Sequence, residues 1–318
     1  MKFLSIFALI LSITSALWAQ TKKAFQVDQV EVQYALAYEG TAIQVNQLIQ
    51  QALERYTGYF PPFQFRHRYR VAIVSPPEWA FIRKQYNIPG WSGGVYLPAQ
   101  RKIFLPGANV TQSLFTLEHT VLHELGHLIL HAYMDSSRVP RWYHEGFAEF
   151  VSKGNIQLAD GIRIANAIWA KQVLMLADMD SLFDFSPGRA QLAYIESLSA
   201  FIFLLQQIGG PEQLAHFHFA VRNKGWSVAL HEFTGMDAAD FEVKWYRWLE
   251  KAYRWFVFAN VDFWVWIMAV LGFIAIYYTI RRRNKQRLAQ WAIQEEVELK
   301  DRQTHSPGNS TIEEEDER

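Results

Sequence analysis

One uncharged segment near the C-terminal end divides this chain. Residues 263–280 form a stretch of 18 residues without a charged side chain, which is long enough for an α-helix to cross the hydrocarbon core of a membrane. Trp264 and Trp266 stand near its start, and Tyr277 and Tyr278 stand near its end, as interfacial aromatic residues do. A buried core helix is the alternative interpretation. The basic residues that follow at once argue against it, so we predict a transmembrane helix over 263–280.

The charges after this helix predict its orientation. Five basic residues lie between positions 281 and 287, and positively charged flanks of membrane helices stay in the cytoplasm. The remaining segment, 281–318, therefore reads as a cytoplasmic tail that begins basic and ends acidic. Residues before the helix are expected on the other side of the membrane.

The N-terminal residues support the same orientation. Residues 1–19 place Lys2 before the apolar run 3–11 and a stretch of small residues that ends at Ala19. This is the order of a secretory signal, and its apolar run is too short to span a bilayer comfortably. An uncleaved anchor is the alternative. A signal followed by a later membrane helix predicts a cell-membrane protein whose main domain is extracytoplasmic, or periplasmic in a bacterium.

The order of the remaining elements indicates the fold class. Alternating or short apolar patterns typical of strands come first, at residues 30–34, 71–74, 95–97 and 102–105. A helix over 43–56 is expected among them, and from Thr111 onward the signals are almost all helical. Strands followed by helices predict an α+β fold, with one globular domain over 25–255.

Composition narrows the chemistry open to this domain. The chain has 31 basic and 31 acidic residues and a formal net charge of zero, so nothing indicates a nucleic-acid partner. It has no cysteine. Disulfides therefore play no part, and any bound metal must be held by histidines and carboxylates.

A His-Glu-x-x-His motif carries the clearest chemical signal. It spans His123-Glu124-Leu125-Gly126-His127, inside an apolar pattern of helical spacing. Four residues advance a helix about 40° beyond a full turn, so His123 and His127 point the same way and can share one metal ion. Glu124 points about 100° away, where it can reach a metal-bound water and take its proton. A chance occurrence is the alternative, and a catalytic zinc needs a third protein ligand.

Other histidines lie close to this motif. His119 and His131 continue the row at four-residue spacing, which makes a longer metal-binding stripe conceivable. A helix rises about 6 Å over four residues, so one ion reaches only two of these side chains. We therefore expect His119 and His131 to be supporting or partly exposed groups. His144 could enter the cleft as a donor to an anion.

A second motif follows downstream. Residues 140–150 read PRWYHEGFAEF, and Glu145 lies 18 residues after His127. With the HELGH motif, this segment resembles the gluzincin metallopeptidases, most closely the peptidase MA-like domains of bacterial envelope proteins. A weaker element of the resemblance is Ala193-Tyr194, which opens a long helix that ends in Gly-Gly. The resemblance covers roughly residues 28–255.

The resemblance implies roles for residues that the spacing leaves open. Glu145 would be the third ligand of a zinc ion, and Glu149 would orient a ligand histidine. Gluzincins hold the oxyanion with a downstream tyrosine or histidine, for which Tyr194 is the candidate here. Tyr194 also follows helical spacing with Leu198 and Phe201, so a place in the core is the alternative.

These assignments predict a membrane-anchored zinc metallopeptidase that hydrolyses a peptide or protein substrate. Glu124 would activate the water, and the substrate backbone would lie along a strand before the motif, at 93–97 or 103–105. One alternative is a zinc hydrolase of a non-peptide envelope substrate. The other is a non-catalytic, peptidase-like binding module, against which the presence of Glu124 and every ligand argues.

The predicted topology can be tested with a reporter. A reporter fused after Arg318 should be active in the cytoplasm, because the basic residues at 281–287 hold that end inside. Protease added outside the membrane should digest residues 20–255. A C-terminal reporter that is active only outside the cytoplasm would contradict this orientation.

Overall fold

The computed structural model of this chain describes residues 23–107, 115–134, 139–259 and 261–304. The predicted signal and the acidic end of the tail lie outside these residues. The chain divides into two units, one that ends at Val257 and one that begins at Phe258. Each unit is described by itself.

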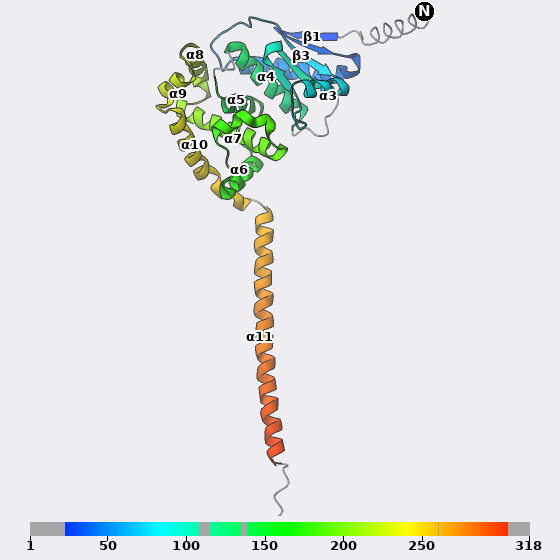
Figure 1. The fold of residues 1–318 in the computed structure, drawn as a ribbon, viewed down its shortest axis with the longest axis vertical. Helices are drawn as coiled ribbons and strands as arrows, with labels where there is room; N and C mark the ends of the chain where they lie inside the picture. Colours follow the sequence, from blue (N-terminus) through cyan, green and yellow to red (C-terminus); the bar gives the residue numbers. More distant parts are fainter. Residues whose placement is uncertain (1–22, 108–114, 135–138, 260, 305–318) are drawn as a thin grey trace, which may run out of the picture. The chain divides into compact units, whose positions relative to one another are not determined.

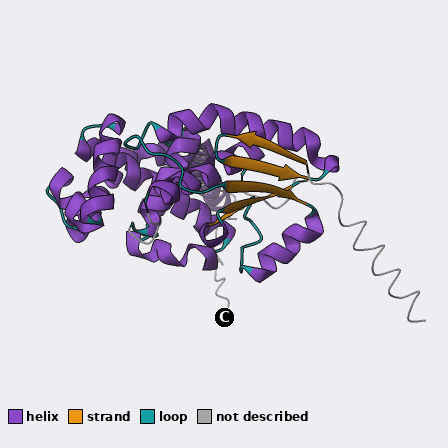
Figure 2. Cartoon of the chain, turned by 90° about the horizontal axis from the view of Figure 1, so that it is seen from above, coloured by secondary structure: helices purple, strands orange, loops and turns teal. Residues whose placement is uncertain are grey.

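The first unit begins with a five-stranded mixed sheet, drawn as arrows in Figures 1 and 2. Its strands are β1 (Lys23–Val27), β2 (Val30–Tyr34), β3 (Tyr69–Val74), β4 (Val95–Leu97) and β5 (Lys102–Pro106). Their spatial order is β1-β2-β3-β5-β4. The three inner strands run parallel, and each outer strand pairs antiparallel with its neighbour. The short strand β4 therefore forms one edge of the sheet.

Helices cover the two faces of this sheet. Val30, Val32 and Tyr34 alternate along β2 and are buried in the main core, which also contains α2 (Glu39–Thr57) and α4 (Leu117–Tyr133). A smaller core on the other face joins the sheet to α3 (Pro76–Gln85). Both cores form because a strand presents alternate side chains to opposite faces.

Helix α3 was not expected from the sequence. Pro76 and Pro77 follow the predicted strand at 71–74 and form the first turn of this helix. The side chain of Ser75 accepts a hydrogen bond from the Glu78 backbone, and the Glu78 carboxylate accepts one from the Ser75 N–H. This capping box, with proline in the first turn, is a helix-start signal that the sequence does contain.

The second half of the unit is helical and confirms the predicted α+β class. Its elements are α5 (Arg141–Lys153), α6 (Leu158–Ala170), η4 (Leu176–Asp184), α7 (Pro187–Ile208), η5 (Pro211–Gln213), α8 (Leu214–Lys224), α9 (Trp226–Thr234) and α10 (Ala238–Tyr253). Three short 3-10 turns lie elsewhere, at η1 (Leu36–Tyr38), η2 (Pro98–Gln100) and η6 (Arg254–Ala259). Helix α5 packs against both α4 and α7.

Two glycines let α5 approach its neighbours closely. A Cβ at Gly126 of α4 would lie 2.9 Å from Val151 Cγ2 and 3.1 Å from Ala148 Cα, both on α5. A Cβ at Gly146 of α5 would collide with the Ser197 carbonyl oxygen on α7. Only glycine allows contact this close, so these positions set the spacing of the three helices.

The second unit consists of one described helix, α11 (Val261–Thr304), which is 44 residues long. Its part Trp264–Arg302 is long and apolar enough to cross a membrane, which is compatible with a single-pass membrane protein. The predicted segment 263–280 lies within this helix. The helix does not end at Ile280 but continues through the basic residues into the predicted tail.

The close contact at Gly146 predicts a stability effect. Gly146→Ala should lower the free energy of unfolding by about 1–3 kcal/mol, because the new methyl group forces α5 and α7 apart. Urea unfolding of the full-length chain in detergent, followed by circular dichroism, measures this. Gly188→Ala is the matched control, since a Cβ there has no neighbour within 4 Å. Equal losses for both variants would show that the close contact does not matter.

Candidate metal centre

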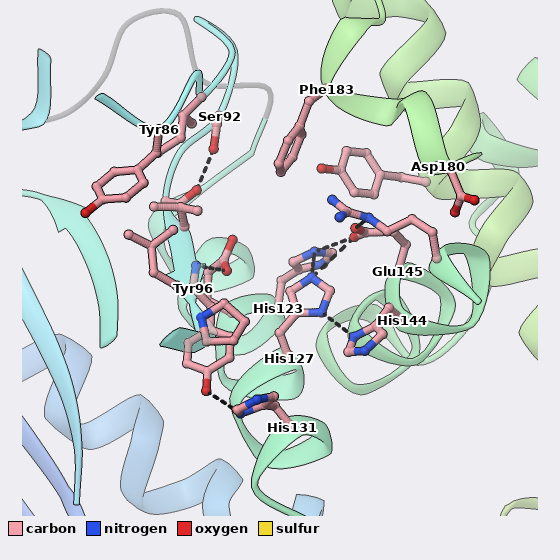
Figure 3. Close-up of a pocket in the computed structure, with 18 of the residues that line it drawn as sticks. Tyr86, Ser92, Tyr96, His123, His127, His131, His144, Glu145, Asp180 and Phe183 are labelled. Atoms are coloured by element: carbon pink, nitrogen blue, oxygen red, sulfur yellow. Dashed lines mark hydrogen bonds and ion pairs between the residues drawn. The ribbon is translucent and has the colours of Figure 1, made fainter. Parts of the chain in front are cut away.

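The His-Glu-x-x-His motif lies in the middle of α4. The helix starts at Thr116, whose side chain accepts a hydrogen bond from the His119 N–H. Its buried residue Leu125 belongs to the main core. The two motif histidines project away from that core toward α5, and His123 Nε2 lies 3.1 Å from His127 Nε2. Figure 3 shows the two rings side by side.

Glu145 brings a carboxylate to the same point. It lies in the second turn of α5, and its Oε2 is 3.2 Å from His123 Nε2 and 3.3 Å from His127 Nε2. This oxygen is buried, yet none of the described residues gives it a hydrogen bond of acceptable geometry. The two imidazole nitrogens are within hydrogen-bond distance of each other, and all three atoms face a common point.

This arrangement fits a tetrahedral metal ion. Two ligands at about 2.0–2.1 Å from one tetrahedral zinc are about 3.3 Å apart, close to the separations of 3.1–3.3 Å found here. Two imidazoles and one carboxylate also form a known ligand set of catalytic zinc sites. His123, His127 and Glu145 can therefore hold a metal ion.

A second carboxylate supports the first ligand from behind. Glu149 lies one helical turn after Glu145 and is fully buried. Its Oε1 lies 3.1 Å from His123 Nδ1 and 3.2 Å from His119 Nε2, and Lys153 Nζ contacts its Oε2 at 2.9 Å. Burial raises the pKa of Glu149, but hydrogen bonds from His119 and His123 outweigh burial and hold this pKa well below its usual range. Glu149 is thus an ionised carboxylate in contact with His123, and its role in orienting that ring stays a prediction.

The structure contains a second group of possible metal ligands next to the first. His119, His123 and Glu149 also bring three ligand atoms together. This cluster uses Nδ1 of His123, whereas the first uses Nε2 of the same ring. All three residues of the first cluster line an open cavity, whereas His119 and Glu149 do not. The cluster with Glu145 is therefore the better candidate metal site.

Arg141 completes the surroundings of Glu145. Its Nε donates a hydrogen bond to Glu145 Oε1 at 2.7 Å. Burial raises the pKa of Glu145, but Arg141 and the two imidazoles outweigh burial and hold this pKa well below its usual range. Burial lowers the pKa of His123, whereas Glu145 and Glu149 raise it, to about 10 overall. A metal ion must displace this proton, so metal affinity should fall as the pH decreases.

Glu124 faces the cleft from the side of the sheet. Its Oε2 accepts a hydrogen bond of 2.7 Å from the backbone N–H of Tyr96 on the edge strand β4. The Tyr96 hydroxyl lies 2.9 Å from His131 Nδ1, one turn after His127 on α4. These contacts connect β4 to the motif helix and orient the carboxylate of Glu124.

An open cleft of about 470 Å³ contains these groups. Figure 3 shows Tyr96 and Ser92 on one side, Asp180, Phe183 and Glu145 on the other, and the motif histidines between them. Glu124, the two motif histidines and Glu145 thus share one cavity that is open to solvent. Such a cavity can admit an extended chain and hold it beside the metal position.

Tyr194 lines this cleft from α7. It is 7% exposed, and its ring stands edge-to-face on His123 with ring centroids 5.5 Å apart. Burial, and then the charge of Glu145, raise the pKa of its hydroxyl well above the usual value. The hydroxyl therefore stays protonated and can donate a hydrogen bond. The ring is buried and the residue also lines the cavity, so its role in catalysis stays a prediction.

Two further histidines have defined neighbours. His144 also lines the cleft, and its Nδ1 lies 3.4 Å from Nδ1 of His127. His119 contacts Glu149, as a supporting group would. The structure therefore brings together the predicted residues His123, Glu124, His127, Glu145 and Tyr194 at one cleft and places Glu149 directly behind it.

Sequence reasoning missed two residues of this site, Arg141 and Phe183, and one contact, made by Tyr96 within the segment 93–97 that was already expected beside the substrate. Arg141 and Phe183 line the cleft next to Glu145, and Tyr96 contacts Glu124 through its backbone. Arg141 stands four residues before Glu145, a spacing typical of an ion pair on a helix, and this signal could have found it. No local pattern marks Tyr96 or Phe183, because both reach the cleft from other elements.

Comparison with known proteins agrees with this geometry. The chain matches no curated protein. The family model described as the Peptidase MA superfamily matches residues 85–251, a range that contains β4, the motif helix, Glu145 and Tyr194. This match covers more than half of the chain and supports a peptidase-like protein whose His/Glu cluster can hold a metal. The chain belongs to the Peptidase MA superfamily.

Proposed function

We propose that this chain is a zinc-dependent peptidase that α11 anchors in the membrane and that acts on the extracytoplasmic side. The observation that carries the proposal is the convergence of His123 Nε2, His127 Nε2 and Glu145 Oε2 within 3.1–3.3 Å of one another, in a cleft that Glu124 also lines. A zinc ion bound there would act as a Lewis acid and lower the pKa of a water molecule.

Residues of the chain would carry out the other steps, which are proton transfer, orientation of a metal ligand and binding of the oxyanion. Glu124 is the general base, which takes a proton from the attacking water and passes it to the leaving amine. The Tyr96 N–H donates a hydrogen bond to Glu124 Oε2, and this bond holds the carboxylate in one orientation. Glu149 holds His123 by its Nδ1, which keeps Nε2 directed at the metal. The Tyr194 hydroxyl donates a hydrogen bond to the oxyanion.

The edge strand β4 supports a peptide as substrate. Tyr96 pairs with Ile103 of β5, and the other side of β4 faces the cleft, where residues 95–97 line the cavity. An extended peptide can lie along such an edge and pair with backbone groups other than the Tyr96 N–H, which already donates to Glu124. The substrate backbone would thereby pass between β4 and the metal position. We therefore propose that the substrate lies along 93–97, rather than along the inner strand 103–105.

The base assignment predicts a separation of metal binding from turnover. Glu124→Gln should keep one bound zinc but lower kcat by about 100- to 10,000-fold, because the amide cannot accept the proton. Purified full-length protein in detergent would be tested on a library of internally quenched peptides, with metal measured by elemental analysis. Glu118→Gln, at an exposed position in the first turn of the same helix, is the control and should cleave normally. Wild-type turnover by Glu124→Gln would remove Glu124 from the mechanism.

The two carboxylates of α5 should differ in their effect on the metal. Glu145→Gln removes a ligand carboxylate, so the ion should be lost on dialysis. Glu149→Gln leaves all three ligand atoms and should weaken zinc affinity only about 10- to 100-fold. Zinc content after dialysis, together with a competitive chelator titration, measures both. If Glu149→Gln loses the ion and Glu145→Gln keeps it, the ligand assignment is reversed.

A further inference from the structure

We propose that Arg141 is a second catalytic group of this cleft and binds the negative oxygen that develops on the scissile carbonyl. This inference rests on the proposed peptidase function. Arg141, with its permanent positive charge, would bind the oxyanion together with the Tyr194 hydroxyl.

The guanidinium of Arg141 is held in one place. Its Nε donates to Glu145 Oε1 at 2.7 Å, and its Cζ lies 4.7 Å from the centre of the Phe183 ring. Among the residues that the structure describes, Glu145 is the one hydrogen-bond partner of this side chain, and the bond uses Nε alone. The side chain lines the cleft and is 33% exposed. Its two terminal nitrogens are therefore left to bind a group in the cavity.

The guanidinium of Arg141 lies next to the candidate metal ligands. Glu145 uses Oε2 toward the two histidines and Oε1 toward Arg141. The guanidinium thus lies beside the ligand set, separated from the metal position by one carboxylate. A carbonyl oxygen that approaches the metal on this side comes within reach of the arginine, whose planar fork suits an oxygen anion.

Arg141 and Glu124 stand on opposite walls of the cleft. Glu124 is bonded to Tyr96 on one wall, and Arg141 stacks on Phe183, which Figure 3 shows on the other wall with Glu145. When water attacks from the side of the base, negative charge grows on the carbonyl oxygen that faces away from it. Of the described residues that line the cleft, Arg141 alone carries a permanent positive charge.

Tyr194 lies on the same side as Arg141. Both side chains line the cleft, and Tyr194 also contacts the ring of His123. A neutral hydroxyl and a guanidinium would therefore converge on one oxygen. Preorganised donors of this kind are most effective when they face the charge of the transition state rather than the ground state.

The competing explanation is that Arg141 only holds Glu145 in place. That role would change zinc affinity, whereas an oxyanion-binding role changes affinity for a tetrahedral anion while zinc stays bound. A suitable probe is a capped phosphinic analogue of acetyl-Phe-Ala-Ala-amide. In this analogue, PO₂–CH₂ replaces the CO–NH of the Phe-Ala peptide bond. Its phosphinate is its only charge, so a free substrate carboxylate cannot account for its binding.

The test compares Arg141→Met and Arg141→Lys with wild type in the zinc-saturated full-length protein. Isothermal titration calorimetry measures the Kd of the phosphinic peptide, and elemental analysis measures zinc. Arg141→Met should keep one zinc and raise this Kd about 100- to 1,000-fold, with Arg141→Lys in between. Arg222→Met is the control, because Arg222 also stacks on an aromatic ring, that of Tyr133, but does not line the cleft.

A neutral peptide tests whether Arg141 binds the ground state of the substrate as well as the charged transition state. Acetyl-Phe-Ala-Ala-amide should bind to Glu124→Gln and to the double variant Glu124→Gln/Arg141→Met within about threefold, because its carbonyl carries no full charge. Unchanged phosphinate affinity in Arg141→Met, loss of zinc at saturation, or no phosphinate binding by wild type would each overturn the inference. Wild type that binds the phosphinate but cleaves no peptide would instead refute the peptidase function and with it the catalytic role of Arg141, and would leave Arg141 only as a group that binds a tetrahedral anion.

Discussion

Two carboxylates buried on one face of α5 are the constraint on which the rest of the site depends. Glu145 and Glu149 are 2% and 0% exposed, and a buried carboxylate is strongly destabilising unless cations and hydrogen bonds compensate it. Arg141 and two imidazoles surround the first, and His119, His123 and Lys153 surround the second. His123 contacts both, one through each ring nitrogen, so α4 and α5 have little freedom to shift relative to each other. A metal ion at Glu145 would take the place of the proton on His123.

The backbone makes this arrangement of charges possible. Gly126 and Gly146 let α5 lie close to α4 and α7, and Tyr56 of α2 donates a hydrogen bond of 2.7 Å to the Val151 carbonyl near the end of α5. The sheet contributes the opposite wall, because β4 presents the Tyr96 N–H to Glu124. The site is therefore assembled from elements that are distant in sequence but rigidly packed, as catalytic geometry requires.

The sequence was sufficient where the signal is local. Alternation along β2 and the spacing of His123 and His127 depend on neighbours within one element, and the structure contains both that strand and the motif helix. The limits appear where contacts are long-range. Tyr96 reaches Glu124 across 28 positions, and no pattern at either residue records the contact. Helix α11 shows another limit, because hydropathy marks only its apolar part although the helix continues into polar sequence.

The most direct measurement is the position of the bound metal. Crystals of the zinc-loaded full-length protein, measured above and below the zinc absorption edge, would locate the ion by its anomalous scattering. The account predicts one peak about 2.0–2.2 Å from His123 Nε2, His127 Nε2 and Glu145 Oε2. A peak among His119, Glu149 and Nδ1 of His123 would contradict it. So would a zinc-loaded crystal with no peak in the cleft.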